Sequence, residues 1–172
     1  MLSLAPNATL IHPHHGAVTV VGREVRVVRG EPTECIVLHS LANRLTIRIP
    51  IDRIDDVGIR PVMSDATLTL VVAALGETMT DEPANWSRRF KTYEQKVASG
   101  SIVQVSEVVR DISRRDVDRG VSPGEKRMLT RAQTNLIAEL SLMPQFADEG
   151  EAIAFVDGLI HAEPRHRERA TA

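Results

Sequence analysis

Pro61-Val62-Met63-Ser64-Asp65 is the stretch at which the hydrophobic pattern of the chain changes its period. Before it, apolar and polar residues alternate, most clearly in Leu45-Thr46-Ile47-Arg48-Ile49, which is typical of a half-buried strand. After it, apolar residues recur at helical spacing, and Ser64 or Asp65 is a suitable helix N-cap. The sequence therefore predicts an α+β fold, in which a small N-terminal β domain is joined near residue 63 to a C-terminal α-helical bundle.

Upstream of this stretch we expect four or five short strands joined by tight turns, which form a small, strongly bent sheet or barrel. The expected strands are 9–12, 17–29, 35–38 and 45–49. Within the second strand, the apolar alternation shifts by one position across Gly22, which is what a β-bulge produces. Pro50 and Pro61 enclose a polar link between this region and the helices.

Two arginines in this region have an informative position. Arg26 lies between two valines, and Arg48 lies between two isoleucines. Because successive side chains of a strand point to opposite faces, both arginines point away from the apolar side. Outward arginines are usually just solvated, but two on one sheet can pair with carboxylates of a protein partner, since the guanidinium group suits interfaces.

Downstream of residue 63, five helices are expected from hydrophobic spacing and from start and stop signals. Their expected spans are 65–75, 83–99, 102–119, 123–142 and 151–161. Pro83 is expected in the first turn of its helix, after the acidic residues Asp81 and Glu82. Ser122-Pro123-Gly124-Glu125 has the pattern of a capping box. The predicted domains are residues 1–62 and 63–162, with a disordered tail at 163–172 that lacks large apolar side chains.

The net charge is only −2, but the charges are unevenly distributed. Residues 86–131 contain eleven Lys or Arg and six Asp or Glu, a net +5, whereas the remainder carries ten against seventeen, a net −7. Such asymmetry can mark a nucleic-acid-binding surface inside a nearly neutral molecule. A helical surface can also be basic for solubility alone, and the charge count does not separate these interpretations.

Composition indicates a soluble, cytoplasmic protein. The single cysteine, Cys35, lies in an apolar run and cannot form an internal disulfide, so a reducing compartment and an inert core thiol are expected. The N-terminus lacks a signal-peptide pattern, and no apolar run is long enough to span a bilayer.

Catalytic and metal-binding motifs are missing from the sequence, which predicts a protein that is not an enzyme and has no cofactor. His12, His14 and His15 are the nearest candidates for metal ligands, but no further ligand has the spacing to complete a coordination shell. A metal-dependent enzyme that uses these three histidines is therefore a distant alternative.

The stretch Glu82-Pro83-Ala84-Asn85-Trp86-Ser87-Arg88-Arg89-Phe90-Lys91 contains the only tryptophan, close to three cations. An apolar wedge surrounded by positive charge suits nucleic acid, with the cations on phosphates. However, Trp86 recurs at helical spacing with Phe90, Tyr93 and Val97, which is also the pattern of a buried stripe. On the residues alone, the general tendency of large aromatic side chains to be buried favours the core interpretation.

Several short motifs occur in a fixed order along residues 10–142. They are Pro13-His14-His15-Gly16, Leu45-Thr46-Ile47-Arg48-Ile49-Pro50, Val57-Gly58-Ile59-Arg60, Glu82-Pro83-Ala84-Asn85-Trp86-Ser87-Arg88-Arg89, Ala98-Ser99-Gly100, Glu107-Val108-Val109-Arg110-Asp111 and Ser122-Pro123-Gly124-Glu125-Lys126-Arg127-Met128-Leu129. In this order the sequence closely resembles the CarD/CdnL family of bacterial transcription factors, which bind RNA polymerase. Members usually have a Gly-Asp pair and a Tyr where this chain has Asn7-Ala8 and His12.

The resemblance implies a Tudor-like N-terminal domain that binds the N-terminal lobe of the RNA polymerase β subunit, with Arg26 and Arg48 at the family's polymerase-contacting positions. It implies a helical domain that contacts promoter DNA largely independently of sequence. Trp86 matches the family's minor-groove wedge at the upstream edge of the transcription bubble. The basic DNA-contacting positions of the family correspond to Arg88, Lys91 and Lys126.

From this resemblance we expect a monomeric, cytoplasmic regulator, associated with the nucleoid through RNA polymerase, that stabilises the open promoter complex. It also changes the expectation for Trp86 to a partly exposed wedge, whereas Phe90, Tyr93 and Val97 remain core residues. The alternative is an adaptor that binds RNA polymerase without touching DNA, in which Trp86 is buried.

Overall fold

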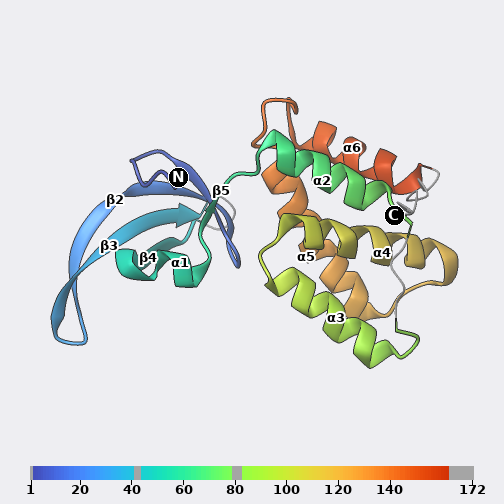
Figure 1. The fold of residues 1–172 in the computed structure, drawn as a ribbon, viewed down its shortest axis with the longest axis horizontal. Coiled ribbons are helices and arrows are strands. Elements are labelled where there is room, and N and C mark those ends of the chain that lie inside the picture. The colour runs from blue at the N-terminus through green and yellow to red at the C-terminus, as the bar shows by residue number, and fades with distance from the viewer. Residues whose placement is uncertain (1, 41–43, 79–82, 163–172) are drawn as a thin grey trace, which may run out of the picture. The chain divides into compact units, whose positions relative to one another are not determined.

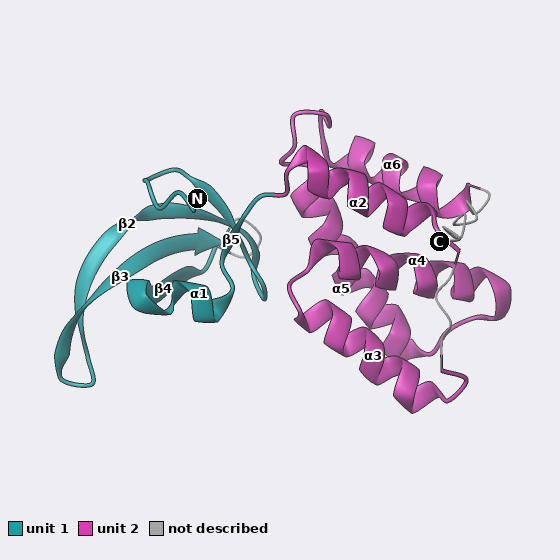
Figure 2. Ribbon diagram, viewed as in Figure 1, with its two compact units in different colours: residues 1–62 teal, residues 63–172 magenta. Residues whose placement is uncertain are grey.

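The computed structural model describes residues 2–40, 44–78 and 83–162. The chain divides into two compact units, residues 1–62 and 63–172 (Figure 2). The first unit is built on a five-stranded sheet and the second is a bundle of helices, which confirms the expected α+β class (Figure 1). The terminal segment 163–172, expected to be disordered, lies outside the described residues.

The first unit is an antiparallel sheet in which neighbours in sequence are mostly neighbours in space. Its strands are β1 (Thr9–His12), β2 (Gly16–Val28), β3 (Glu31–Ser40), β4 (Thr46–Pro50) and β5 (Arg60–Pro61). They are arranged in the order β4-β3-β2-β1-β5. Short turns connect β1 to β2 and β2 to β3, as the tight spacing of the apolar runs predicts.

The β-bulge expected near Gly22 is confirmed by the register between β2 and β3. Val20 pairs with Leu38, but Gly22 pairs with Val37, so Val21 is the extra residue. Beyond the bulge, Val25 lies on the face of the sheet opposite to Arg26 but is exposed, because the hairpin of β2 and β3 extends past the core (Figure 1).

The polar link between Pro50 and Pro61 contains more structure than the sequence indicates. A 3₁₀ turn (Ile51–Arg53) leads into α1 (Ile54–Val57), a single helical turn, and β5 then pairs with β1. Elements of two to four residues are too short to show a hydrophobic period, which is why the sequence does not predict them.

The unusual start of the chain is accommodated by its backbone conformation. Asn7, at the position where the resemblance leads one to expect glycine, adopts a left-handed φ of 67°. Asparagine tolerates this conformation better than most residues, because its short polar side chain can hydrogen-bond locally. The N–H of Asn7 donates to the carbonyl of Val20 at 2.8 Å, so this segment remains attached to β2.

The described part of the second unit contains five helices. They are α2 (Asp65–Gly76), α3 (Trp86–Ala98), α4 (Ile102–Arg119), α5 (Pro123–Leu140) and α6 (Glu149–His161). Of the two N-caps proposed for the first helix, Ser64 is the one used; Ser101 caps α4, and Ser122 and Glu125 form the predicted capping box. Because caps depend on residues within one turn, the sequence predicts them well.

The start of α3 differs from the prediction. Pro83 does not lie in the first turn; the side chain of Asn85 caps the helix by accepting the N–H of Arg88 at 3.1 Å, and Trp86 is the first helical residue. Asparagine is among the best N-cap residues, so it determines where the helix begins. Asp81 and Glu82, expected to suit the helix dipole, lie outside the described residues.

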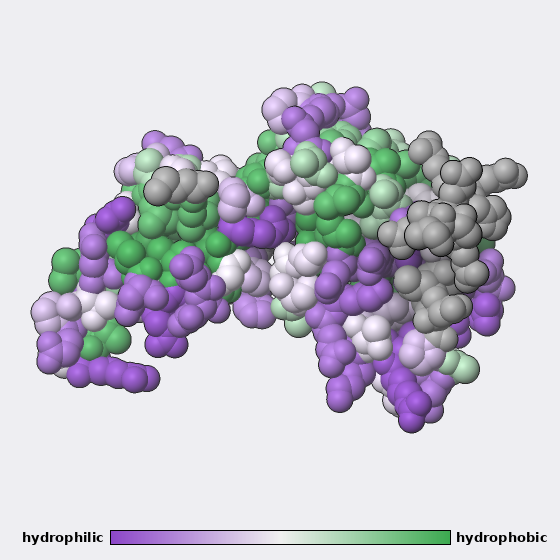
Figure 3. All heavy atoms as spheres, in the orientation of Figure 1, coloured by the Kyte–Doolittle hydropathy of each residue, from purple (hydrophilic) through white to green (hydrophobic). Residues whose placement is uncertain are grey.

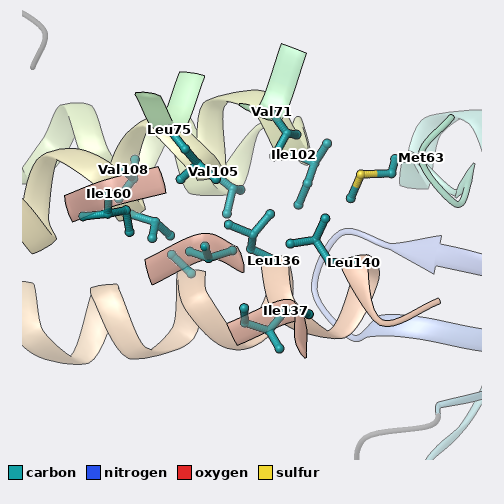
Figure 4. Close-up of a cluster of buried hydrophobic side chains, with 14 of the residues drawn as sticks. Met63, Val71, Leu75, Ile102, Val105, Val108, Leu136, Ile137, Leu140 and Ile160 are labelled. Atoms are coloured by element: carbon teal, nitrogen blue, oxygen red, sulfur yellow. The ribbon is translucent and has the colours of Figure 1, made fainter. Parts of the chain in front are cut away.

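The core of the second unit is aliphatic and surrounds α4, whose Val105 and Val108 meet Leu136 of α5, Leu75 of α2 and Ile160 of α6 (Figure 4). The residues at helical spacing that the sequence predicts to face inward are buried, except that Leu129 is only partly buried against the cluster; they are Ile102, Val105, Val109 and Ile112 of α4 and Leu129, Ala132, Leu136 and Leu140 of α5. Tyr93, in the middle of α3, is the apolar side chain of this helix that is fully buried. The residues at both ends of α3, Trp86 and Ala98, are exposed.

Candidate functional site

Arg26 and Arg48 of the first unit converge on one carboxylate. The Nε of Arg48 lies 2.6 Å from Glu24 Oε1, and the Nε of Arg26 lies 3.5 Å from the same oxygen. Both arginine side chains are exposed. The sequence predicts that both point away from the apolar face, but it does not predict that Glu24 joins them.

The strand register explains why these three residues share a face. Arg48 of β4 pairs with Val37 of β3, which pairs in turn with Gly22 of β2. Glu24 and Arg26 lie two and four residues after Gly22, so they point to the same face of the sheet as Arg48. A single carboxylate has fewer acceptor sites than two guanidinium groups have donors. The face can therefore donate further hydrogen bonds to carboxylates of a protein partner.

Trp86 of the second unit is partly exposed. It is the first residue of α3, and 48% of its surface is accessible. The buried-core interpretation of Trp86 is therefore wrong. Of the other residues of the expected stripe, Tyr93 is buried, Val97 is partly buried against the core, and Phe90 is only partly buried. Helical spacing identifies the stripe but does not show where the stripe leaves the core.

The indole of Trp86 has two neighbours. Its Nε1–H donates to Ser122 Oγ at 3.2 Å, across 36 residues of sequence. Its ring stacks on Phe90, with centroids 5.3 Å apart and an interplanar angle of 26°. Because Ser122 is the N-cap of α5 and Trp86 begins α3, two helix N-termini with positive dipole ends meet here. This arrangement suits a negatively charged ligand.

A buried ion pair lies beneath the indole. Arg89 is 4% exposed and donates through Nε and Nη2 to Glu125 Oε1 at 3.2 and 3.1 Å. The other carboxylate oxygen of Glu125 accepts the hydroxyl of Ser122 at 2.8 Å. The sequence places Arg89 in the cation cluster near Trp86, but its charge is internal and it does not face solvent.

The pKa of Glu125 is lowered in the folded protein. Burial acts to raise the pKa, but hydrogen bonds from the backbone and side chain of Ser122 and from Arg89 outweigh it. Glu125 is therefore an ionised acceptor at neutral pH.

The basic residues at the other predicted positions are exposed. Arg88 and Lys91 lie on α3, and Lys126 lies in the first turn of α5 next to Glu125, where its Nζ is 3.8 Å from Asp116 Oδ1. Hydrophilic side chains project from the lower edge of the helical unit, where Figure 1 places α3 (Figure 3). The structure thus places Arg88, Lys91 and Lys126 in the same unit as Trp86, on α3 and in the first turn of α5, and places Arg26 and Arg48 in the other unit.

Two further arginines of the basic stretch are not available to a ligand. Arg110 is fully buried against Asp111 and the carbonyl of Ala74. Arg114 donates to carbonyls at the ends of α2 and α6, and burial lowers its pKa. Because Arg89 and Arg110 are each paired with an acid, the positive excess of residues 86–131 remains with the other side chains.

The histidines do not form a metal site. Within the described residues, no group of three or more His, Cys, Asp or Glu is placed to hold a metal ion. His12 is buried, and its Nδ1 accepts the N–H of His14 at 3.0 Å. Burial, followed by the nearby His15 and His14, lowers the pKa of His12 to about 4, so the ring is neutral at neutral pH. Cys35 is a buried free thiol.

Across the described residues, no helix is long and apolar enough to cross a membrane.

The sequence does not predict the role of three residues of the site. The capping box identifies Ser122, but nothing local indicates its contact with Trp86, and neither Glu24 nor Phe90 carries a motif.

Two family models match the chain. Residues 4–63 match the CarD-like/TRCF RID domain, and residues 70–157 match the CarD C-terminal domain. The chain is also 28% identical over 134 residues, 78% of its length, to "Putative transcription factor YdeB" of Bacillus subtilis (strain 168), of which the match covers 88%. The two matched segments correspond to the two structural units.

Proposed function

Because the chain belongs to the CarD family of transcription factors, we propose that it binds the RNA polymerase β subunit with its sheet unit and stabilises the open promoter complex with Trp86. The RID domain family implies an interaction with RNA polymerase, and CarD family transcription factors are non-enzymatic. In this proposal the protein acts as a monomer, since one copy carries both surfaces, and it works in the cytoplasm, where its family of transcription factors acts.

The sheet unit provides the polymerase contact. Arg26 and Arg48 present guanidinium donors on one exposed face, and Glu24 holds the two side chains in place. A guanidinium group recognises carboxylates with two parallel hydrogen bonds. The partner surface is the N-terminal lobe of the β subunit, with acidic residues opposite the two arginines.

The helical unit provides the DNA contact, and the half-exposed Trp86 is the observation that supports it most strongly. A large flat apolar side chain, held outward among cations, can enter the minor groove and stack on an unpaired base at the edge of the bubble. Arg88, Lys91 and Lys126 then bind phosphates on either side. Since minor-groove contacts distinguish bases poorly, binding depends little on sequence.

The two contacts support each other because one chain carries both. Once the sheet unit is bound to the polymerase, the helical unit has a high local concentration at the promoter, without any stronger DNA contact of its own. Weak, sequence-independent DNA binding is then sufficient for an effect on the bubble.

The lifetime of the open complex on a promoter with unstable melting tests this proposal, with no factor, the wild-type protein or Trp86→Ala. Loss of stacking on one base, about 1–3 kcal/mol, should shorten the lifetime about tenfold. Leu70→Ala removes an exposed apolar side chain of α2 and should keep the wild-type lifetime. A folded Trp86→Ala protein with full activity would exclude the wedge.

An adaptor without DNA contact is the competing proposal; the burial of Trp86 that was expected with it is contradicted by the 48% exposure of that side chain, but an exposed indole that never meets DNA is still compatible with an adaptor. Acrylamide quenching of the sole tryptophan addresses the two directly. A half-exposed indole should be quenched readily in the free protein and protected when the open complex forms. Quenching that does not change on complex formation would favour the adaptor.

A further inference from the structure

Trp86 has an unusual combination of exposure and constraint. Exposed side chains normally change rotamer on the picosecond to nanosecond timescale. A wedge that must enter a narrow groove loses binding free energy if its side chain has to be ordered first. Contacts that already hold the indole in one rotamer in the free protein therefore lower the free-energy cost of inserting it into the groove.

The hydroxyl of Ser122 accepts the indole N–H with the one hydrogen-bonding position that its other two hydrogen bonds leave free. A serine hydroxyl has one proton and two acceptor lone pairs. Its proton goes to Glu125 Oε2 at 2.8 Å, because an ionised carboxylate can only accept. One lone pair accepts the N–H of Glu125 at 3.2 Å, and the other accepts the indole Nε1–H of Trp86 at 3.2 Å. All three positions of the hydroxyl are thus used.

This hydroxyl is fixed in turn through a closed ring of contacts. Glu125 is held by the buried Arg89, which lies three residues after Trp86 on the same helix. The N-terminus of α5 is therefore connected to α3 at two points, one buried and one exposed. The buried Arg89–Glu125 pair keeps the two helix ends together when DNA binds at the exposed Trp86–Ser122 contact.

The ring face of Trp86 is supported from the same helix end. Phe90 stacks on the indole one turn along α3 and lies against Gly124 of α5, where an added Cβ would be 3.3 Å from Phe90 Cε2. A larger residue at Gly124 would displace the ring on which the indole rests. The absent side chain of Gly124 thus forms part of the support.

From this geometry we infer that Ser122 is a positioning residue, which orients Trp86 for the DNA before the promoter is bound. This inference rests on the proposed function of Trp86 and assigns the preorganisation of the wedge to the N-cap of α5. Ser122 contributes no DNA contact of its own. Without the Ser122 hydroxyl, the indole samples several rotamers in the free protein and must be ordered when DNA binds, which weakens the complex with the promoter.

Ser122→Gly tests the inference, because glycine is tolerated at an N-cap at a cost of only a few tenths of a kcal/mol but has no acceptor for the indole. Ser122→Thr keeps the hydroxyl. Ser101→Gly is the matched control, since Ser101 caps α4 through the N–H of Gln104 and is not an acceptor of the indole. Helical circular dichroism and thermal melting should show that all three variants are folded.

Time-resolved fluorescence anisotropy of the sole tryptophan, in the free full-length protein, is the first measurement. Ser122→Gly should add a fast component to the decay, whereas Ser122→Thr and Ser101→Gly should resemble the wild type. The second measurement is open-complex lifetime, which Ser122→Gly should shorten roughly two- to fivefold, the effect of one neutral hydrogen bond. The effect should be smaller than that of Trp86→Ala.

An unchanged anisotropy decay in Ser122→Gly would overturn the inference, as would a wild-type lifetime in a variant whose indole has become mobile. These outcomes differ from failure of the proposed function, which Trp86→Ala alone decides. If Trp86→Ala had no effect on the lifetime, the anisotropy would still show whether Ser122 orients the indole.

Discussion

The sheet unit and the helical unit treat their charged side chains in opposite ways. Within the described part of the chain, the buried charged residues all belong to the helical unit: Arg89, Arg110, Asp111, Glu125 and Glu139. In the sheet unit, Arg26 and Arg48 are exposed, and the buried imidazole of His12 is kept neutral.

The difference separates structural arginines from those available to a partner. A buried ion pair requires a partner for each charge, because an isolated charge in the interior is very costly. An exposed ion pair contributes at most about 1 kcal/mol and can be exchanged for contacts with another molecule. The arginines of the sheet are therefore suited to binding, and Arg89 and Arg110 to holding helices together.

The largest expected effect is on the buried pair. Arg89→Ala leaves Glu125 buried without its cation and should lower the free energy of unfolding of the helical unit by about 3–5 kcal/mol. Denaturation followed by the fluorescence of Trp86 reports on this unit. Arg88→Ala, one residue earlier and exposed, should change it by less than about 0.5 kcal/mol. Equal losses of unfolding free energy in the two variants would contradict a structural role for Arg89 that the exposed Arg88 lacks.

Next is the exposed pair of the sheet. Arg48→Glu should weaken binding to the polymerase β lobe by about thirtyfold or more, because a carboxylate replaces a donor opposite acidic residues. Binding can be measured by surface plasmon resonance with the isolated lobe. The variant should keep the fold, and Arg53→Glu, an exposed arginine next to α1, should keep the affinity. Unchanged affinity for Arg48→Glu would exclude this docking face.

A smaller effect concerns the neutral histidine. Because the pKa of His12 is about 4 when folded and near 6.5 when unfolded, the unfolded chain takes up the proton first as pH falls. The stability of the sheet unit should be full above pH 6.5 and fall between pH 6.5 and 4, by about 1–3 kcal/mol. Urea unfolding followed by NMR signals of β2 measures this, and His12→Phe should remove the dependence. A slope that persists in His12→Phe would assign it to other groups.

The smallest effect is expected for a single surface cation. Lys91→Ala should reduce the DNA-dependent part of open-complex stabilisation only a few-fold, and should lower the slope of its salt dependence by about one charge. Lifetimes at several salt concentrations provide the slope. Lys96→Ala, whose Nζ is paired with Glu107 at 2.8 Å, is the control and should keep the slope. Identical slopes for wild type and Lys91→Ala would remove Lys91 from the DNA surface.

Local signals in the sequence predicted much of the fold. The period change at residues 61–65, the β-bulge at Gly22 and the caps at Ser64, Ser101 and Ser122 all rest on residues within one turn or one strand pair. The start of α3 was misplaced because Pro83 and Asn85 are both good initiators, and the stronger cap prevailed.

The sequence by itself determined the two-part α+β architecture and the family. Only the tertiary structure decided which cations face solvent, that Glu24 joins Arg26 to Arg48, and that Trp86 is exposed yet held by Ser122. These features join residues 24 and 36 positions apart in the chain. Hydrophobic period and caps act over a few residues, whereas burial and long-range hydrogen bonds depend on how whole elements pack together.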